Sequence, residues 1–297
     1  MAKRLVGGIA AAIATMMCLA MESASATEGG GNQYFNSASN IMAGFGLAPG
    51  DYFMSYTGYY HTDRLNDADG NKKPIAFNVT TVSESLRYIH RTSLELLGGQ
   101  WGYYAVVPIA HVDARVGNRR QRKDGLGDIL LVPAVLAWHT PNLHWVAAVD
   151  FTMPTGKYNK NDIANTGRNT FGIMPNFGIT YLNDSGFEAS ARIMYSFTTV
   201  NRDTSYLSGQ EFMVDYFLGA HLGQWTAGLA GYSYLQTTDD SIAGVTVANA
   251  RGMAQALGPV VSYNFGTFQV FGSYTHEVVA ENRPMADRGL IRAVVHF

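Results

Sequence analysis

The chain has 297 residues, with 21 lysines and arginines against 23 aspartates and glutamates, so its formal net charge at pH 7 is −2. This near-neutral balance argues against a protein that binds nucleic acids through their phosphates. Glycine (32 residues), tyrosine (17) and phenylalanine (15) are abundant, and this composition is typical of β structure with many turns. After the amino-terminal segment, no stretch is apolar for long enough to cross a membrane as a helix.

The amino terminus predicts an export signal. Two basic residues precede an apolar run at 6–20, and the small residues 24–26 form a cleavage site. The apolar run is too short to span a bilayer comfortably, which disfavours a membrane anchor. We therefore expect residues 1–26 to be a cleaved signal peptide. The single cysteine, Cys18, would leave with it, so the mature chain would have no disulfide, no thiol nucleophile and no cysteine metal ligand.

Residues 27–49 form a leader that is first polar and rich in glycine. Its second part, 37–44, is compatible with one or two turns of helix, and Pro49-Gly50 ends it. Two interpretations stay open for this leader. It is either a disordered segment or a segment inserted into the mouth of the fold that follows.

From residue 50 onward, apolar-rich segments of strand length alternate with connections of two kinds. Five connections are tight hairpin turns, such as Gly98-Gly99-Gln100, and six are longer and polar. The expected strands are 51–61, 76–97, 101–115, 127–139, 143–153, 171–182, 186–198, 210–221, 225–237, 252–265, 268–279 and 289–297. The expected long connections are 62–75, 116–126, 154–170, 199–209, 238–251 and 280–288.

Short and long connections alternate along the whole of this division. A transmembrane barrel shows this pattern because its periplasmic turns are short and its extracellular loops are long, whereas a soluble sandwich has no reason to sort its loops by length. The sequence therefore predicts an all-β fold: a single transmembrane β-barrel over residues 50–297, with about 12 antiparallel strands, short periplasmic turns and long extracellular loops.

The aromatic residues agree with this prediction. All four tryptophans lie close to a short turn, where they would form a girdle at one membrane interface. The last strand ends in Phe297, with Val295, Ala293 and Ile291 on the same face. Such a strand suits the closing strand of an outer-membrane barrel, and we expect it to be the contact with the outer-membrane assembly machinery. The expected location is the outer membrane of a Gram-negative bacterium.

Charged residues fall on one face of the expected strands. In 186–198, for example, Glu188 and Arg192 oppose an apolar face that contains Phe187 and Phe197. Because a charge facing the middle of the bilayer costs a few kcal/mol, the charged face should line the lumen. The candidate lumen-lining residues are Arg87, Arg91, Glu95, Asp150, Glu188, Arg192, Asp215 and Arg292.

Two strands, 101–115 and 127–139, are apolar on both faces and each has a proline near its middle, Pro108 and Pro133. Proline cannot donate to the ladder, so these residues interrupt the wall, and we expect them at similar depth on neighbouring strands. One interpretation is that they mark bulges or kinks that shape the barrel. The other is a local gap through which an apolar solute leaves sideways into lipid.

A series of short motifs is similar to a known family. They are Gly125-Leu126-Gly127-Asp128, Pro154-Thr155-Gly156-Lys157-Tyr158, Gly178-Ile179-Thr180-Tyr181-Leu182, Ser208-Gly209-Gln210-Glu211 with Asp215, Gly231-Tyr232 and Gly258-Pro259. In this order, over most of residues 45–297, the chain resembles the outer-membrane channel family of phenol-degradation meta-pathway proteins. The resemblance implies a twelve-stranded monomeric barrel that passes small, often hydrophobic, molecules. It implies no catalytic residues.

Motifs for catalysis, metals and cofactors are incomplete. His276-Glu277-Val278-Val279-Ala280 lacks the second histidine of a zinc-protease helix, and the loop at 67–70 lacks the closing glutamate of a calcium site. No Gly-x-Ser-x-Gly elbow occurs. We therefore expect no enzyme activity, no metal and no cofactor.

The favoured function is passive uptake of small, hydrophobic or aromatic molecules through the barrel, with membrane lipids and lipopolysaccharide as its surroundings. A lipid hydrolase on the outer face stays open, for which Ser273 and His276 are candidates that fall on opposite faces of one strand. A channel for small acidic or polar solutes, including acidic oligosaccharides, and a purely structural barrel stay open as well. An acidic-sugar channel needs dense arginine tracks, whereas the lumen candidates here carry both signs.

Overall fold

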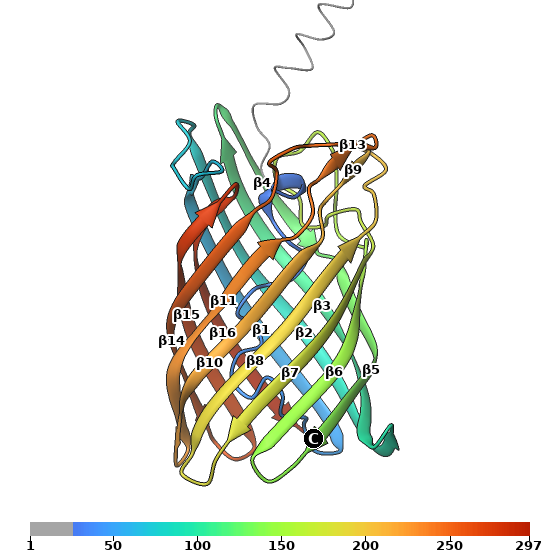
Figure 1. Cartoon of the computed structure of the whole chain (residues 1–297), viewed down its shortest axis with the longest axis vertical. Coiled ribbons are helices and arrows are strands. Elements are labelled where there is room, and N and C mark those ends of the chain that lie inside the picture. Colours follow the sequence, from blue (N-terminus) through green and yellow to red (C-terminus); the bar gives the residue numbers. More distant parts are fainter. Residues whose placement is uncertain (1–25) are drawn as a thin grey trace, which may run out of the picture.

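The computed structural model of the chain describes residues 26–297. Within them, a sheet closes on itself to form a single transmembrane β-barrel (Figure 1). The sheet has 13 strands, but β4 (Arg119–Leu126) and β5 (Ile129–His139) follow one another along the same edge of β3 (Gly99–Val116). Twelve antiparallel strands therefore surround the lumen, which confirms the predicted fold class.

The other strands have the following bounds. They are β1 (Gly50–Leu65), β2 (Phe77–Leu96), β6 (Leu143–Met153), β7 (Gly172–Leu182), β8 (Phe187–Thr198), β10 (Glu211–Leu222), β11 (Trp225–Gln236), β14 (Met253–Asn264), β15 (Phe268–Glu281) and β16 (Pro284–His296). Three short strands, β9 (Tyr206–Leu207), β12 (Ser241–Ile242) and β13 (Val245–Thr246), make a small separate sheet in the long loops. Over residues 26–297, none of the helical turns has the length and apolar character of a membrane-spanning helix.

The barrel closes where the first strand meets the last. β1 pairs antiparallel with β16, with Tyr52 opposite His296 at the short-turn end. Side chains alternate along each strand between the outer surface and the lumen. On β8, for example, Glu188 is fully buried, whereas Phe187 and Phe197 are exposed on the outer surface. The outer surface is therefore apolar, as a surface in lipid must be.

The short turns all lie at one end of the barrel, as predicted, but two of the predicted long loops are wrong. Residues 116–126 continue the wall: β4 pairs with β3, and only residues 117 and 118 join them (Figure 1). Residues 280–288 likewise form the ends of β15 and β16, which are joined by residues 282 and 283. β4 carries four basic residues, and Asp287 faces outward on β16, while the inward residues Ala286 and Arg288 are buried. The apolar alternation that marks a membrane strand is therefore absent from their sequence.

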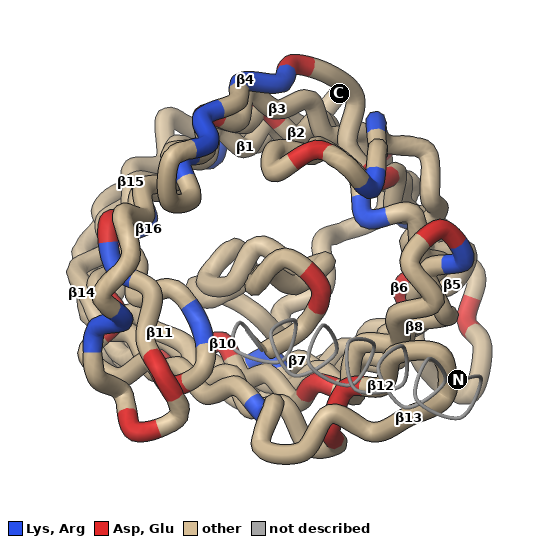
Figure 2. Tube along the Cα trace, turned by 90° about the horizontal axis from the view of Figure 1, so that it is seen from above, with Lys and Arg blue, Asp and Glu red and all other residues tan. Residues whose placement is uncertain are grey.

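The leader runs through the inside of the barrel, from the long-loop end to the short-turn end, where β1 begins (Figure 1). Seen from above, its coil lies nearer to β7 and β10 than to β1, β2 and β3 (Figure 2). It contains one short 3₁₀ turn, η2 (Glu28–Gly30), and residues 37–44 form turns rather than the helix considered above. The expected signal peptide, residues 1–26, lies outside the described residues except for Ala26.

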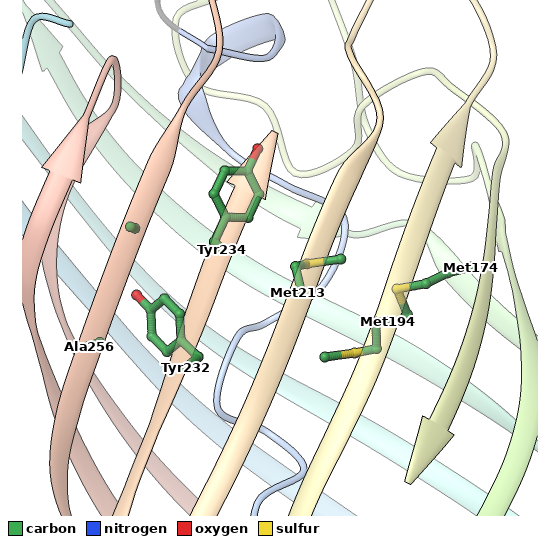
Figure 3. Packing of buried hydrophobic residues seen from close by; sticks show 7 residues of the cluster. Met174, Met194, Met213, Tyr232, Tyr234 and Ala256 are labelled. Atoms are coloured by element: carbon green, nitrogen blue, oxygen red, sulfur yellow. The ribbon is translucent and has the colours of Figure 1, made fainter. Parts of the chain in front are cut away.

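Buried apolar side chains inside the barrel gather in three clusters. The first lies on the inner faces of β7, β8, β10, β11 and β14, and Tyr34 of the leader packs against it (Figure 3). It comprises Met174, Met194, Met213, Tyr232, Tyr234, Ala254 and Ala256. The second cluster includes Ile41 of the leader. The third, called here the apolar wall, comprises Tyr52, Met54, Ile89, Tyr104 and Val132.

Candidate functional site

The inward carboxylate of Asp215 on β10 binds the middle of the leader. Its Oδ1 accepts a hydrogen bond from the backbone N–H of Ser37 at 2.8 Å. Its Oδ2 accepts from the Tyr34 hydroxyl at 2.7 Å and from the Ser39 N–H at 3.2 Å. Because the carboxylate is fully buried, these three donors take the place of water around its charge.

Glu188, one strand away on β8, binds the next part of the leader. Its Oε1 accepts from the Met42 N–H at 2.6 Å, and its Oε2 lies 2.6 Å from Nε2 of His221. Two residues further, the Gly44 N–H donates to the Thr180 hydroxyl at 2.9 Å. A Cβ at Gly44 would lie 2.5 Å from the backbone of β7, so only glycine allows this close approach.

At the long-loop end, Asp240 binds the start of the leader. Its carboxylate accepts from the backbone N–H groups of Thr27 at 3.0 Å and Gly209 at 2.6 Å, and from the Tyr206 hydroxyl. Burial raises the pKa of this carboxyl above its ordinary value, while these hydrogen bonds act in the opposite direction. The leader is thus bonded to the barrel at its start, middle and end.

Asp150 and Arg192 form an ion pair across the intervening strand β7, with 3.0 Å between Oδ2 and NH2. Asn176 on β7 and Tyr104 on β3 bond to the same Asp150 carboxylate, at 2.9 and 3.0 Å. Arg192 also donates to the Ser39 hydroxyl of the leader at 3.0 Å. Two residues that the sequence predicts separately thus meet in one network.

On the opposite side of the lumen, β1, β2, β3 and β5 present the apolar wall and two arginines. Arg87 on β2 and Arg292 on β16 point inward and are half-buried. They flank Tyr56 of β1: the Tyr56 hydroxyl accepts from NH1 of Arg87 at 3.2 Å, and Arg292 is the residue directly opposite Tyr56 in the ladder. We call this side, with Arg87, Arg292 and the apolar wall, the open side.

The two remaining candidates have different environments. Arg91 is buried at the short-turn end, where its guanidinium donates to the carbonyls of Val135 and Gln100 at 3.1 Å and of Leu47 at 3.4 Å. It thereby ties the end of the leader to the wall. Glu95 lies beyond a register shift in β2, beside the short turn, and is exposed rather than grouped with the buried charges.

Pro133 lies within a β-bulge of β5. The register of β5 shifts against β6 between Leu131 and Val135, and against β3 in the same stretch. Pro108 lies where β3 changes its partner from β5 to β4, and its carbonyl accepts from the Gly127 N–H at 2.8 Å. The expectation of similar depth is wrong: β5 is shifted by its bulge and joined to β4 rather than to a loop. Pro133 therefore lies beside the region of Tyr104, nearer the short turns than Pro108.

The break between β4 and β5 is closed by the long loop at 154–170. The Asp128 carboxylate accepts from the N–H groups of Gly156 at 2.9 Å and Arg168 at 2.7 Å. A Cβ at Gly156 would lie 2.5 Å from Gly167 and 2.9 Å from Gly127, so the backbones touch here. Two of the motifs that carry the family resemblance therefore form one joint in the wall.

The same loop is held to β4 by an ion pair between Lys123 and Asp162, with 2.5 Å between Nζ and Oδ2. The hydrogen bond from Lys123 holds the pKa of the Asp162 carboxyl below its ordinary value, with a second contribution from Gln121. The loop is thus fixed across the range in which this carboxylate is ionised.

One buried network is missing from the sequence prediction. Glu277 of β15 accepts from the Tyr232 hydroxyl and from the Ala286 N–H at 2.9 Å, and Arg288 of β16 lies 3.5 Å from it. Arg288 falls in the predicted loop 280–288 and was therefore not assigned to the lumen. The alternation of Ser273, Thr275 and Glu277 with outward residues was a signal that could have placed Glu277 there. Among residues 26–297, no three histidine, cysteine or acidic side chains lie close enough together to bind a metal ion.

Comparison with known proteins shows a match to one protein family and structural similarity to several outer-membrane barrels. A family model described as "Putative MetA-pathway of phenol degradation" matches residues 62–293. The COG4313 outer membrane channel from Pseudomonas putida F1 is similar with a TM-score of 0.78 and 18% identity, covering 89% of this chain and 100% of that chain.

Two autotransporter barrels are similar at lower scores. The β domain of the Bordetella autotransporter BrkA has a TM-score of 0.51 and 10% identity, covering 84% of this chain and 100% of that one. The translocator domain of NalP from Neisseria meningitidis has a TM-score of 0.51 and 8% identity, covering 86% of this chain and 91% of that one. At these identities the likeness is one of fold. A search of curated proteins finds no match.

Proposed function

The chain belongs to the family described as "Putative MetA-pathway of phenol degradation", and from this premise we propose that it is an outer-membrane channel for passive uptake of small hydrophobic or aromatic molecules. The observation that carries the proposal is the apolar wall on the open side. Tyr52, Met54, Ile89, Tyr104 and Val132 turn their side chains into the lumen, although the lumen of a general porin is polar.

An apolar wall favours apolar solutes for a simple reason. Each apolar group that leaves water for such a surface gains about 25 cal/mol per Å² of area removed from water. Most of the leader lies on the opposite side of the lumen, but its Leu47 packs against the apolar wall, whose side chains are only 1–7% exposed. A solute that passes between the leader and the apolar wall would therefore have to part these contacts. The bonds from Asp215 and Glu188 would keep the leader away from that path.

The proposed location is the outer membrane of a Gram-negative bacterium, where lipopolysaccharide slows the entry of apolar compounds. The last strand, β16, which ends at His296 just before Phe297 and closes the ladder with β1, would be the contact with the assembly machinery. The outer surface would be covered by lipid and lipopolysaccharide. Recovery of the folded protein in the outer-membrane fraction of a Gram-negative host tests the location.

Uptake by intact cells tests the function, because small apolar compounds cross protein-free lipid vesicles unaided. Host cells that produce the chain should accumulate radiolabelled toluene several-fold faster than cells with the empty vector. Uptake of a sugar of similar size, such as arabinose, should change much less. Equal rates of toluene uptake in the two strains would contradict the proposal.

The lipid-hydrolase hypothesis gains no support from the geometry of His276. This side chain faces outward, with Nδ1 2.8 Å from Oδ1 of Asp287, whereas its candidate partner Ser273 lies on the inward-facing set of β15. A hydrolytic pair needs both groups on one face. Release of fatty acid from phospholipid by the purified protein would revive this hypothesis.

A further inference from the structure

We propose that Arg87 and Arg292 form a binding site for the carboxylate group of small aromatic acids inside the lumen. The inference rests on the proposed channel function and narrows its substrate class. It would make aromatic anions, rather than neutral hydrocarbons alone, the preferred solutes of the open side.

The two arginines lie on the strands that flank β1. Arg292 is opposite Tyr56 in the β1–β16 ladder, and Arg87 is opposite Met54 in the β1–β2 ladder. Their Cα atoms are thus separated by two strand spacings, or about 10 Å, plus the offset along the strands. Both side chains extend over the inner face of β1 toward the Tyr56 hydroxyl, to which Arg87 donates.

Within residues 26–297, neither guanidinium has a carboxylate partner. Two further inward arginines do have one: Arg192 pairs with Asp150 at 3.0 Å and Arg288 with Glu277 at 3.5 Å. Arg292 makes a hydrogen bond of 3.5 Å, at the upper limit, to the carbonyl of Ala38. The Nε atoms of Arg87 and Arg292 are buried without a partner.

Accessibility distinguishes these two from Arg283. Its Nε also has no partner, but its side chain is only 4% exposed and a solute could not reach it. Arg87 and Arg292 are half-buried, and of the two only Arg292 contacts the leader, at the carbonyl of Ala38. A solute beside them would meet the terminal N–H groups of the guanidiniums, because both Nε atoms are buried.

Aromatic rings fix the planes of both guanidiniums. The Cζ of Arg87 lies 3.7 Å from the centre of the Tyr104 ring, and the Cζ of Arg292 lies 3.7 Å from the centre of the Phe271 ring. A guanidinium that stacks on a ring keeps its N–H edge free to form two parallel bonds with a carboxylate. The arrangement is therefore suited to a planar anion better than to a neutral molecule.

The neighbouring rungs supply the apolar half of the site. Met54 lies directly opposite Arg87, and Ile89 lies two residues nearer the short turn on the same inner face, where both side chains are buried in the apolar wall. A benzene ring at the edge of this buried cluster would leave its carboxylate within reach of the arginines. Carboxylates of the barrel do not compete, because Asp215, Glu188 and Asp150 are engaged elsewhere.

Binding of benzoate and of benzyl alcohol by the purified full chain in detergent, measured by calorimetry, tests the proposal. The two ligands share the ring and differ in charge. The double variant Arg87→Gln/Arg292→Gln should bind benzoate at least about tenfold more weakly, the factor expected for loss of charged hydrogen bonds, with benzyl alcohol unaffected. Arg115→Gln, an exposed and outward arginine of β3, is the matched control and should bind both ligands as the unaltered chain does.

A second variant separates binding from folding. Arg87→Lys/Arg292→Lys keeps both charges but loses the paired N–H geometry, so its benzoate affinity should fall between those of the unaltered chain and the glutamine variant. Heat-modifiability on gels checks that each variant is folded. Equal benzoate affinity in the glutamine variant and the unaltered chain would overturn the inference. The channel function is tested separately, by toluene uptake in cells, so that its failure can be distinguished from failure of the arginine site.

Discussion

The two sides of the lumen use charge in opposite ways. On β8 and β10, the acidic side chains Glu188 and Asp215 are fully buried and bonded to the leader. On β2 and β16, the basic side chains Arg87 and Arg292 are half-buried and lack an acidic partner within residues 26–297. A buried charge that is unpaired costs stability. We infer that the first side serves to hold the leader and the second to meet solutes.

The largest effect should follow from removing the leader. Deletion of residues 27–46 frees the space beside β7, β8 and β10, and Asp215 and Glu188 would then be hydrated. Single-channel conductance in planar bilayers should rise several-fold. The barrel ladder itself is untouched, so heat-modifiability should persist. A folded variant with unchanged conductance would show that the leader does not limit the pore.

A smaller change on the same side is Asp215→Asn. It removes the charge that three leader donors share, and hydrogen bonds to charged groups contribute about 1.5–3 kcal/mol. We expect the leader to leave its place more often, so that limited proteolysis within residues 27–49 becomes about tenfold faster. Glu95→Gln, the same kind of change at an exposed strand end, is the control. Equal proteolysis of both variants would argue against the anchoring role.

The open side is tested by a polar residue beside the apolar wall. Val106→Gln, at a half-buried inward position that packs against the apolar wall, should lower the rate of toluene uptake about threefold, because a polar amide replaces apolar surface along the path. The matched control is Met194→Gln, at a fully buried position on the side that packs with the leader. Should both variants lower toluene uptake equally, the two sides would not differ in the way described.

The smallest effect is expected for the two prolines. Pro133 belongs to a bulge, and the wall beside Pro108 is closed by Gly127 and the loop at 154–170. Pro108→Val and Pro133→Val should therefore leave toluene uptake unchanged in cells. A marked fall in uptake would instead favour a sideways exit into lipid beside these residues.

Some of the lumen was predictable from the sequence and some was not. Alternation along a single strand places Glu188 and Arg192 on the face opposite Phe187, and this needs only a period of two. The ladder at Arg288 was not predictable, because its outward residues Met285 and Asp287 do not form the apolar face that marks the other strands. The bulge at Pro133 shifts the register, so the relative depth of the two prolines could not be read from their positions in the chain.

The sequence by itself determined the membrane barrel, the side of each strand that faces lipid and the end that carries the short turns. These follow from local alternation and from the high cost of polar groups in hydrocarbon. Only the tertiary structure decided which inward charges meet. Asp150 reaches Arg192 across β7, Asp215 meets the leader 176 to 181 residues away in the chain, and Arg87 meets no carboxylate among the described residues. Such contacts depend on register and on distances across a closed lumen, and no sequence period encodes them.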